Sequence, residues 1–436
     1  MLIESKDKHG NVTLKVEVNK IDDTKKSIYI ASKYDVLKEA KEFALNHKSR
    51  LTDINLLYGL GLGYHVKELL KFLKVNQKLI VFDLRIDIFK FAQSRNLYKD
   101  FEKNPNVIII VNDNEKILAD NIEPFLTEDA YFITHTPSIK SISDNNSNFR
   151  FILERIEMTR IYKHNIFLQE LLYDNLSKNS LLNDYGVEKF FNKFIGVPGI
   201  IVSAGSSLEF SIEQISKIED KAFIFAVGRS LTSLLKIGVK PHMFCIIDAE
   251  ELTYEQIKGY ENENIPLMYL NTASYLTVSS YKGPRFVFYN SNHKIDHIDT
   301  GGSVATAVFS LLIRFGCNPI IFVGQDLAYT NNQTHYKDAK YSDSSIEIKE
   351  LKNMRKVKSV NGEYLNTDLG LISFKKWFEK KIRQSDRIFI NSSFGADIEG
   401  TLHMPLEEAE KNYMKTDLDI RNRINGIINS LRNKGD

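Results

Sequence analysis

The feature that most constrains this chain is a regular alternation of short apolar runs with helical segments in its second half. Strands are predicted at 199–203, 222–227, 242–247, 266–270, 285–288 and 319–323. Runs that are apolar along their whole length are typical of strands buried on both faces, as in parallel sheets. Since most of these runs are separated by helical patterns, the second half predicts a doubly wound α/β domain.

The first half of the chain repeats this alternation on a smaller scale. Strands are predicted at 54–58, 78–82, 107–111 and 130–134, after a leading β-hairpin formed by 12–18 and 27–31. The sequence therefore predicts two Rossmann-like domains with doubly wound parallel sheets, joined by helices and followed by a helical tail. The predicted boundaries are 1–140 for the N-terminal domain, 141–194 for the helical connector, 195–400 for the central domain and 401–436 for the tail.

Composition excludes several classes of protein. The 58 Lys and Arg nearly balance the 56 Asp and Glu, so bulk charge gives no indication of nucleic-acid binding. The basic stretch 349–358 is expected to be a solvated loop or helix face. Cys245 and Cys317 lie in or beside apolar runs without CxxC spacing, which predicts buried thiols rather than a disulfide or zinc site. With no secretory signal and no membrane-spanning stretch, we expect a soluble, cytoplasmic protein of open oligomeric state.

A glycine-rich turn follows the first predicted strand of the N-terminal domain. Gly59, Gly61 and Gly63 come after that strand, and Asp83 closes the next one about twenty residues later. This arrangement is typical of nucleoside-binding units, in which the carboxylate binds ribose, and the GxGxG spacing is nearer to methyltransferases than to dinucleotide-binding proteins. A domain that keeps the turn and binds no cofactor is the alternative.

A second turn of this kind opens the central domain. Gly205 lets a backbone approach closely, and Ser206 and Ser207 are placed to cap a helix that begins near Leu208. Amide groups at a helix start favour phosphate or carboxylate, so the turn is a candidate anion site. The alternative is a turn whose glycine and serines only reverse the chain and cap the helix.

The predicted central strands share small, polar or acidic residues at their ends. These endings are Gly205–Ser207, Gly228–Ser230, Asp248–Glu250, Asn271–Ala273, Asn290–Asn292 and Gly324–Asp326. Because ligands of open parallel sheets bind outside the carboxyl ends of the strands, the endings predict a polar ligand with phosphate or sugar character.

Three further features extend this candidate site. Thr300, Gly301, Gly302 and Ser303 precede an apolar helix, where bare amides would bind an anion and a simple cap is the alternative. Asp248-Ala-Glu250 resembles the DxD signature of metal-dependent glycosyltransferases, which keeps a divalent metal open as an alternative.

A polar loop follows Asp326 and carries Tyr329, His335 and Tyr336. Histidine is suited to take a proton from an acceptor hydroxyl, and tyrosine hydroxyls stabilise a leaving phosphate without metal. A plain surface histidine is the alternative for His335.

Several of these motifs together resemble the motility accessory factor (Maf) family of flagellated bacteria. The resemblance is carried by 57–65, 199–208, 226–231, 238–241, 247–248, 301–304 and 324–330 with His335, and it covers nearly the whole chain. It implies a glycosyltransferase that moves a nonulosonic acid, pseudaminic or legionaminic, from its CMP-activated form to Ser or Thr of flagellin. The central domain would then be similar to bacterial sialyltransferases.

The resemblance also implies roles for individual residues. Gly205, Ser206, Ser207 and the turn 300–303 would hold the donor, with Asp248 and Asn271 on the same rim. Asp326, Tyr329, His335 and Tyr336 would line the reacting centre, and no metal or other cofactor would be obligatory.

Two alternatives remain at this stage. A related branch comprises Mg-dependent hydroxymethylpterin pyrophosphokinases, although no clear Lys or Arg stands beside the first turn to bind a triphosphate. The other is a non-catalytic module that binds flagellin.

Overall fold

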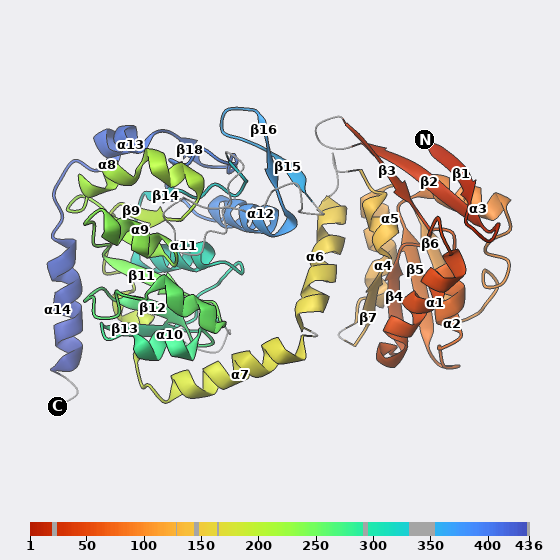
Figure 1. Cartoon of the computed structure of the whole chain (residues 1–436), viewed down its shortest axis with the longest axis horizontal. Coiled ribbons are helices and arrows are strands. Elements are labelled where there is room, and N and C mark those ends of the chain that lie inside the picture. The colour runs from red at the N-terminus through yellow and green to blue at the C-terminus, as the bar shows by residue number, and fades with distance from the viewer. Residues whose placement is uncertain are drawn as a thin grey trace. The chain divides into compact units, whose positions relative to one another are not determined.

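The computed structural model describes residues 1–19, 24–127, 129–143, 148–163, 165–290, 295–330 and 354–433. The chain divides into two compact units, an N-terminal unit (Met1–His164) and a C-terminal unit (Asn165–Asp436), which Figure 1 colours along the chain. Each unit contains its own sheet with apolar cores on both faces.

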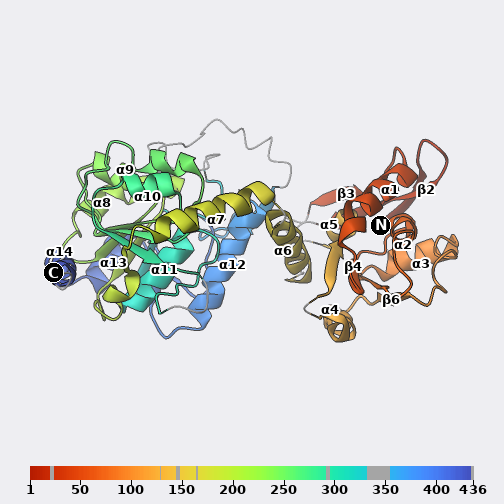
Figure 2. The ribbon, with the colours of Figure 1, turned by 90° about the horizontal axis from the view of Figure 1, so that it is seen from below.

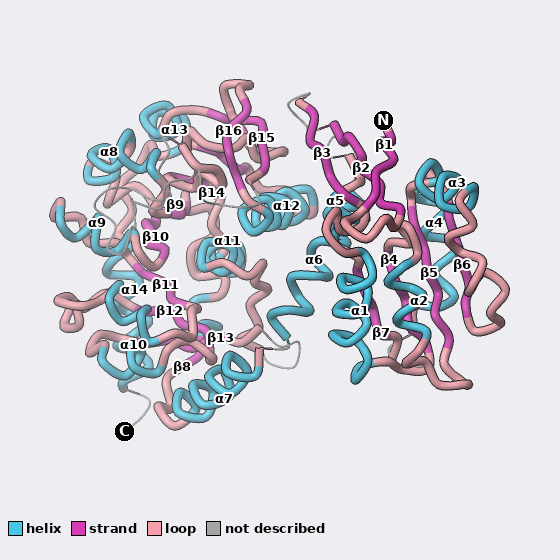
Figure 3. The backbone as a smooth tube through the Cα atoms, turned by 45° about the vertical axis from the view of Figure 1, so that its right-hand side comes forward, coloured by secondary structure: helices cyan, strands magenta, loops and turns pink. Residues whose placement is uncertain are grey.

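The N-terminal unit alternates strands and helices after an antiparallel start. Its elements are β1 (Leu2–Lys6), β2 (Val12–Asn19), β3 (Lys25–Tyr29), α1 (Val36–His47), β4 (Ile54–Tyr58), α2 (Tyr64–Leu70), β5 (Lys78–Asp83), α3 (Ile86–Ser94), β6 (Val107–Val111), α4 (Glu115–Ile122), β7 (Tyr131–Thr134), α5 (Thr136–Lys140) and α6 (Asn148–Lys163). The parallel sheet has the order β6-β5-β4-β7 (Figure 3). Alternate strand residues pack against α1, α2 and α3 on one face and against α4, α5 and α6 on the other.

The C-terminal unit is larger and is built on one nine-stranded sheet. Its elements are α7 (Ile166–Ser180), β8 (Tyr185–Gly186), β9 (Gly199–Val202), α8 (Ile212–Ser216), β10 (Phe223–Val227), α9 (Ser230–Lys236), β11 (Met243–Ile246), β12 (Leu267–Leu270), α10 (Tyr275–Ser280), β13 (Arg285–Phe288), α11 (Val304–Phe315), β14 (Ile320–Val323), β15 (Arg355–Lys358), β16 (Tyr364–Thr367), α12 (Leu369–Arg383), β17 (Phe389–Asn391), β18 (Leu402–His403), α13 (Leu406–Tyr413) and α14 (Ile420–Arg432).

All strands of this large sheet run parallel, in the order β18-β17-β14-β9-β10-β11-β12-β13-β8. Alternate residues of each strand face opposite cores because successive side chains of a strand point to opposite sides. One core contains residues of α11, α12 and α14, and the other contains residues of α8, α9, α10 and α13. Figure 2 shows α9 and α10 on one side of this unit and α11 and α12 on the other. The predicted doubly wound fold with a helical C-terminal region is therefore confirmed.

Local differences from the sequence predictions occur where pairing depends on a distant partner. Of the basic stretch 349–358, residues 349–353 lie outside the described residues, and 355–358 form a strand paired antiparallel with β16 in which Val357 is buried. At the N-terminus, β1 adds a third antiparallel strand to the predicted hairpin. The predicted helical stretch 145–193 also contains the short strand β8.

The prediction that the two cysteines are buried thiols is confirmed. Cys245 and Cys317 are fully buried free thiols, and burial raises the pKa of both. Within the described ranges, none of the helices combines the length and apolar character that crossing a bilayer requires.

Candidate active site

The topology of the large sheet identifies one preferred place for a ligand. After the short edge strand β8, the chain places β9, adds β10 to β13 on one side of it, and then crosses back to place β14 on the other side of β9. The strand order thus reverses between β9 and β14. Ligands of open α/β sheets bind in the crevice outside the carboxyl ends of the strands at such a switch point. The loops at this point are 203–207 after β9 and 324–330 after β14.

Hydrogen bonds lock these two loops together. Ser203 Oγ donates to Gln325 Oε1 over 2.5 Å. The amide of Gly205 donates to the carbonyl of Gly324 over 2.8 Å. The Ser207 amide donates to Asp326 Oδ2 over 2.9 Å, across 119 positions of sequence. The structure therefore brings four of the predicted site residues (Gly205, Ser206, Ser207 and Asp326) into one cluster.

Asp326 is the anion that this turn binds. Its carboxylate accepts from the hydroxyl of Ser207, from Ser206 Oγ at 3.3 Å and from Thr330 Oγ1 at 3.1 Å, as well as from the Ser207 amide. Burial raises the pKa of Asp326, and these donors oppose the shift. The expected serine caps are absent here, since residues 206–210 form a 3₁₀ helix without a side-chain cap. The sequence predicted that this turn binds a phosphate or carboxylate, and here that group is the carboxylate of Asp326.

The glycine at 205 is required by the neighbouring loop. A Cβ atom at this position would lie 2.4 Å from the carbonyl oxygen of Gly324 and 2.7 Å from the carboxyl carbon of Asp326. Both distances are far below van der Waals contact. Another backbone segment does approach Gly205 closely, as the sequence predicts. That segment is the loop after β14.

A third loop, which the sequence analysis missed, completes the cluster. Ser393 Oγ accepts from the amide of Gln325 at 2.9 Å, and the amide of Ala396 donates to the carbonyl of Asp326 at 2.7 Å. A Cβ at Gly395 would lie 2.1 Å from that same carbonyl oxygen. The run Asn-Ser-Ser-Phe-Gly at the end of β17 consists mostly of small and polar residues, like the other strand ends. This loop could therefore have been predicted by the same criterion.

Tyr329 lies beside this cluster with its hydroxyl engaged. The hydroxyl donates to Asp368, and the amide of Tyr329 donates to the carbonyl of Asn366 at 2.8 Å. Burial, together with the bond to Asp368, raises the pKa of Tyr329. Asp368 also caps α12 by accepting from the amide of Leu371 at 2.9 Å. The sequence signal for Asp368 was an aspartate directly before an apolar helical pattern.

The turn 300–303 begins α11, the helix that crosses one face of the sheet. Ser303 caps the helix by accepting from the Thr306 amide at 3.3 Å, and Thr306 Oγ1 accepts from the Gly301 amide at 2.9 Å. A Cβ at Gly301 would lie 2.6 Å from the indole of Trp377. Since α11 connects the end of β13 to the start of β14, its first residues lie at the carboxyl edge of the sheet.

Two predicted residues lie farther along the rim. Asp248, after β11, is exposed; desolvation by its neighbours raises its pKa, and Arg229 opposes the shift. Asn271, after β12, has a buried side-chain oxygen that no described group of the chain hydrogen-bonds. Among the described residues, no three His, Cys, Asp or Glu are grouped as a metal site would require.

Helix α7 fixes this part of the rim through two asparagines that the sequence analysis did not identify. Asn175 Nδ2 donates to the carbonyl of Ala249 at 2.9 Å, and Asn179 Nδ2 donates to the carbonyl of Ala273 at 2.8 Å. Residues four apart share one helix face, so a single face of α7 holds the loops after β11 and β12. The sequence feature that could have predicted this contact is the pair of asparagines four residues apart in a helix that also carries charged residues.

Replacing Asn179 with leucine is expected to lower the free energy of unfolding of the C-terminal unit by about 1–2 kcal/mol, because buried loop carbonyls lose their donor. Urea unfolding followed by the fluorescence of Trp377, the single tryptophan, measures this unit alone. Lys178→Ala on the same helix is the control, since its ion pair with Asp174 is half exposed and contributes little. Equal losses in the two variants would contradict the proposed role of Asn179.

Two predicted catalytic residues, His335 and Tyr336, lie outside the described residues, which stop at 330 and resume at 354. Their assignment remains a prediction from the sequence.

Comparison with known proteins adds three findings. A family model described as 6-hydroxymethylpterin diphosphokinase MptE-like matches residues 170–332. The solved structure of the Maf glycosyltransferase from Magnetospirillum magneticum AMB-1 matches with a TM-score of 0.52 and 13% sequence identity. That match covers 98% of this chain and 74% of the other. No curated protein sequence matches.

The structural match extends across both units, as the order of the sequence motifs predicts. At this level of identity it establishes the fold. The chain shares its fold with the Maf glycosyltransferase of Magnetospirillum magneticum AMB-1.

Proposed function

We propose that this protein is a glycosyltransferase of the Maf type. It transfers a nonulosonic acid, pseudaminic or legionaminic, from the CMP-activated sugar to Ser or Thr of flagellin in the cytoplasm. The observation that carries the proposal is the switch point of the large sheet, where the strand order reverses and the loops after β9 and β14 are locked together. The fold shared with a Maf glycosyltransferase supports the class of reaction.

In this proposal Asp326 is a positioning residue. The hydrogen bonds of its carboxylate go to Ser206, Ser207 and Thr330, so this carboxylate holds the turn in place. The donor lies outside this turn, with its phosphate toward the start of α11 and the rim residues Asp248 and Asn271. The unpartnered oxygen of Asn271 is suited to accept from a sugar hydroxyl or a cytosine amino group.

The reaction needs a proton acceptor and support for the leaving phosphate. The acceptor hydroxyl of flagellin attacks the anomeric carbon, the bond to the CMP oxygen breaks, and the hydroxyl proton passes to His335. Amides at the start of α11 and the hydroxyl of Tyr336 stabilise the charge that develops on the departing phosphate, whereas the Tyr329 hydroxyl already donates its proton to Asp368. This route requires no metal.

His335→Ala is expected to lower the transfer rate by about 100-fold or more while CMP binding stays within twofold, because general-base catalysis contributes about that much. The measurement is the intact mass of flagellin after incubation with the CMP-sugar, alongside calorimetric titration with CMP. Transfer at the unaltered rate would remove His335 from the mechanism. Loss of CMP binding would instead assign it to the donor site.

A second candidate is a diphosphokinase, which the family match over 170–332 favours. It would transfer diphosphate from ATP to a 6-hydroxymethylpterin and would require Mg²⁺. Incubation of the protein with ATP, Mg²⁺ and the pterin separates the two, because this reaction releases AMP and leaves flagellin unchanged. If neither reaction occurs and flagellin still binds, the non-catalytic alternative is correct.

A further inference from the structure

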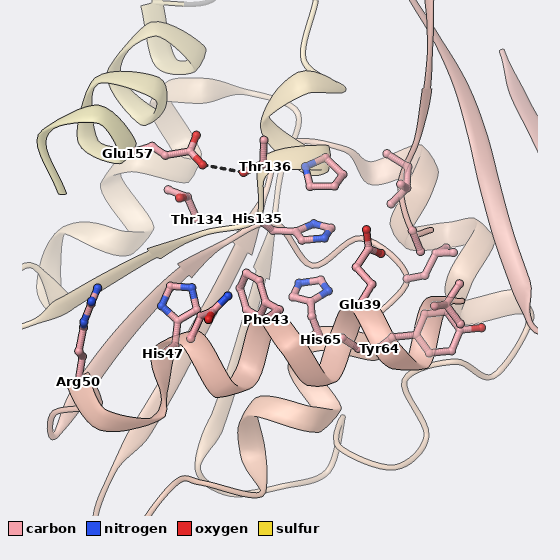
Figure 4. Close-up of a pocket in the computed structure, with 17 residues that line it drawn as sticks. Glu39, Phe43, His47, Arg50, Tyr64, His65, Thr134, His135, Thr136 and Glu157 are labelled. Carbon is pink, nitrogen blue, oxygen red and sulfur yellow. Dashed lines mark hydrogen bonds between the residues drawn. The ribbon is translucent and has the colours of Figure 1, made fainter. Parts of the chain in front are cut away.

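The N-terminal unit contains a cavity of about 400 Å³ that the proposed transfer does not use. Its sheet also has a switch point, since β4 is followed by β5 and β6 on one side and by β7 on the other. The cavity lies at this point, because its lining includes 62–65 after β4 and 134–137 at the end of β7. Figure 4 shows Thr134 and Thr136 on the opposite side from the α1 residues Glu39, Phe43 and His47. The position is the one where open sheets bind ligands.

The glycine turn beside this cavity does not present a phosphate or ribose site. The amides of Leu60 and Gly61 donate to Asp83 Oδ2 at 2.8 and 3.4 Å, and the amide of Gly63 donates to the carbonyl of Leu60. Asp83 is buried, and a Cβ at Gly59 would lie 2.6 Å from Ser138. Of the two readings of this turn, the contacts favour the one that binds no nucleoside through Asp83, because the turn amides already bind its carboxylate.

Two neutral histidines form one wall of the cavity. The rings of His65 and His135 stack with centroids 3.8 Å apart, and both side chains are buried. Burial lowers the pKa of His65 to about 4 and that of His135 well below its ordinary value. His65 Nε2 lies 2.8 Å from the carbonyl of Gly59 and must donate to it, so Nδ1 is left as an acceptor.

An unsatisfied hydroxyl and a half-buried carboxylate complete the lining. Thr134 is 4% exposed, and its Oγ1 has no hydrogen-bond partner among the described groups. Such a group costs free energy unless something binds it. Glu39 accepts from the amide of Ser32 through Oε2 at 2.8 Å, and burial raises its pKa.

The charges of the lining select the class of ligand. Glu39 and Glu157 are acidic, the histidines are neutral, and the basic residue Arg50 is exposed and lies at the opposite end from Glu39 in Figure 4. With the turn amides already used, an anion finds few donors here. A cation near Glu39 offsets the desolvation of that carboxylate.

We propose that this cavity binds a small hydroxylated primary amine of about the size of an amino sugar. The ammonium group pairs with Glu39. Hydroxyl groups pair with Thr134 Oγ1 and His65 Nδ1, and the carbon skeleton lies against the ring of Phe43, which contacts both stacked histidines edge-on.

Calorimetric titration of the full chain with glucosamine, galactosamine and ethanolamine tests this proposal, with glucose as the matched probe lacking the amine. At least one amine is expected to bind roughly tenfold or more tighter than glucose, because the ion pair forms in a partly desolvated site. Binding in mildly acidic buffer should also release protons, since the ammonium lowers the pKa of Glu39. Failure of all three amines, or equal affinity for glucose, overturns the proposal.

Variants separate a binding role from a structural one. Glu39→Gln is expected to remove the preference for the amine, whereas Asp100→Asn, which changes an exposed ion pair of the same unit, leaves it intact. Thr134→Val is expected to weaken amine binding about fivefold and to raise the thermal stability of the free protein, because it removes an unpartnered buried hydroxyl. Unaltered affinity in both Glu39→Gln and Thr134→Val also overturns the proposal.

Discussion

Gly205→Val is expected to lower the free energy of unfolding of the C-terminal unit by roughly 2–3 kcal/mol and to abolish CMP binding. The new Cβ would lie 2.4 Å from the backbone oxygen of Gly324 and 2.7 Å from the carboxyl carbon of Asp326. Neither neighbour is the free end of a flexible side chain. Relief of the clash must separate the two loops, which disturbs the carboxyl edge of the sheet at the switch point, where the donor is proposed to bind.

Urea unfolding followed by Trp377 fluorescence measures the stability, and titration with CMP measures the binding. Gly426→Ala in α14 is the matched control, since a Cβ there meets nothing within 4 Å. Alanine in a helix interior should raise stability by about 0.5–1 kcal/mol. A Gly205→Val protein that binds CMP normally would show that the donor site does not depend on the contact between these two loops.

Acid should destabilise the N-terminal unit strongly. His65 has a pKa of about 4 in the folded protein against 6.5 as its ordinary value. The unfolded chain therefore binds the proton more tightly over this interval, so stability is fully present above pH 6.5 and falls as the pH drops toward 4. This shift corresponds to about 3 kcal/mol, and His135, whose pKa burial also lowers, adds to the loss.

Hydrogen exchange of the β4 and β5 amides at a series of pH values measures this loss within the N-terminal unit. His65→Gln should flatten the pH dependence there, because glutamine keeps a donor for the carbonyl of Gly59 and does not titrate. The C-terminal unit serves as the internal control. Its own acid sensitivity, which arises from buried His242, should stay unchanged in that variant. A pH profile of the N-terminal unit identical to wild type would show that His65 does not carry the effect.

The sheet strands were predictable because each is apolar along its length and is followed by small polar residues. The six central runs correspond to β9 through β14. The sequence did not reveal β1, β8 or β15, since their residues become strands only through partners supplied by the fold. Their own patterns are short or charged.

The candidate site was predictable in its residues and only partly in its contacts. Gly205, Ser206, Ser207 and Asp326 were all expected at the rim, and all four meet there. The sequence did not predict that the carboxylate of Asp326 itself binds the amide of this turn. That contact joins residues 119 positions apart, and local sequence patterns do not encode such contacts. The hydrogen bond from Asn175 to the loop after β11 was unpredictable for the same reason, since it also joins residues far apart in the sequence.

The position of β9 in the middle of the sheet has a consequence for synthesis on the ribosome. One edge of β9 pairs with β10 soon after both emerge, but its other edge waits for β14, which leaves the exit tunnel much later. Until then the nascent chain exposes an unpaired, wholly apolar strand edge of the kind that invites pairing with other chains. For the same reason, the contacts between the loops after β9 and β14 form late in synthesis.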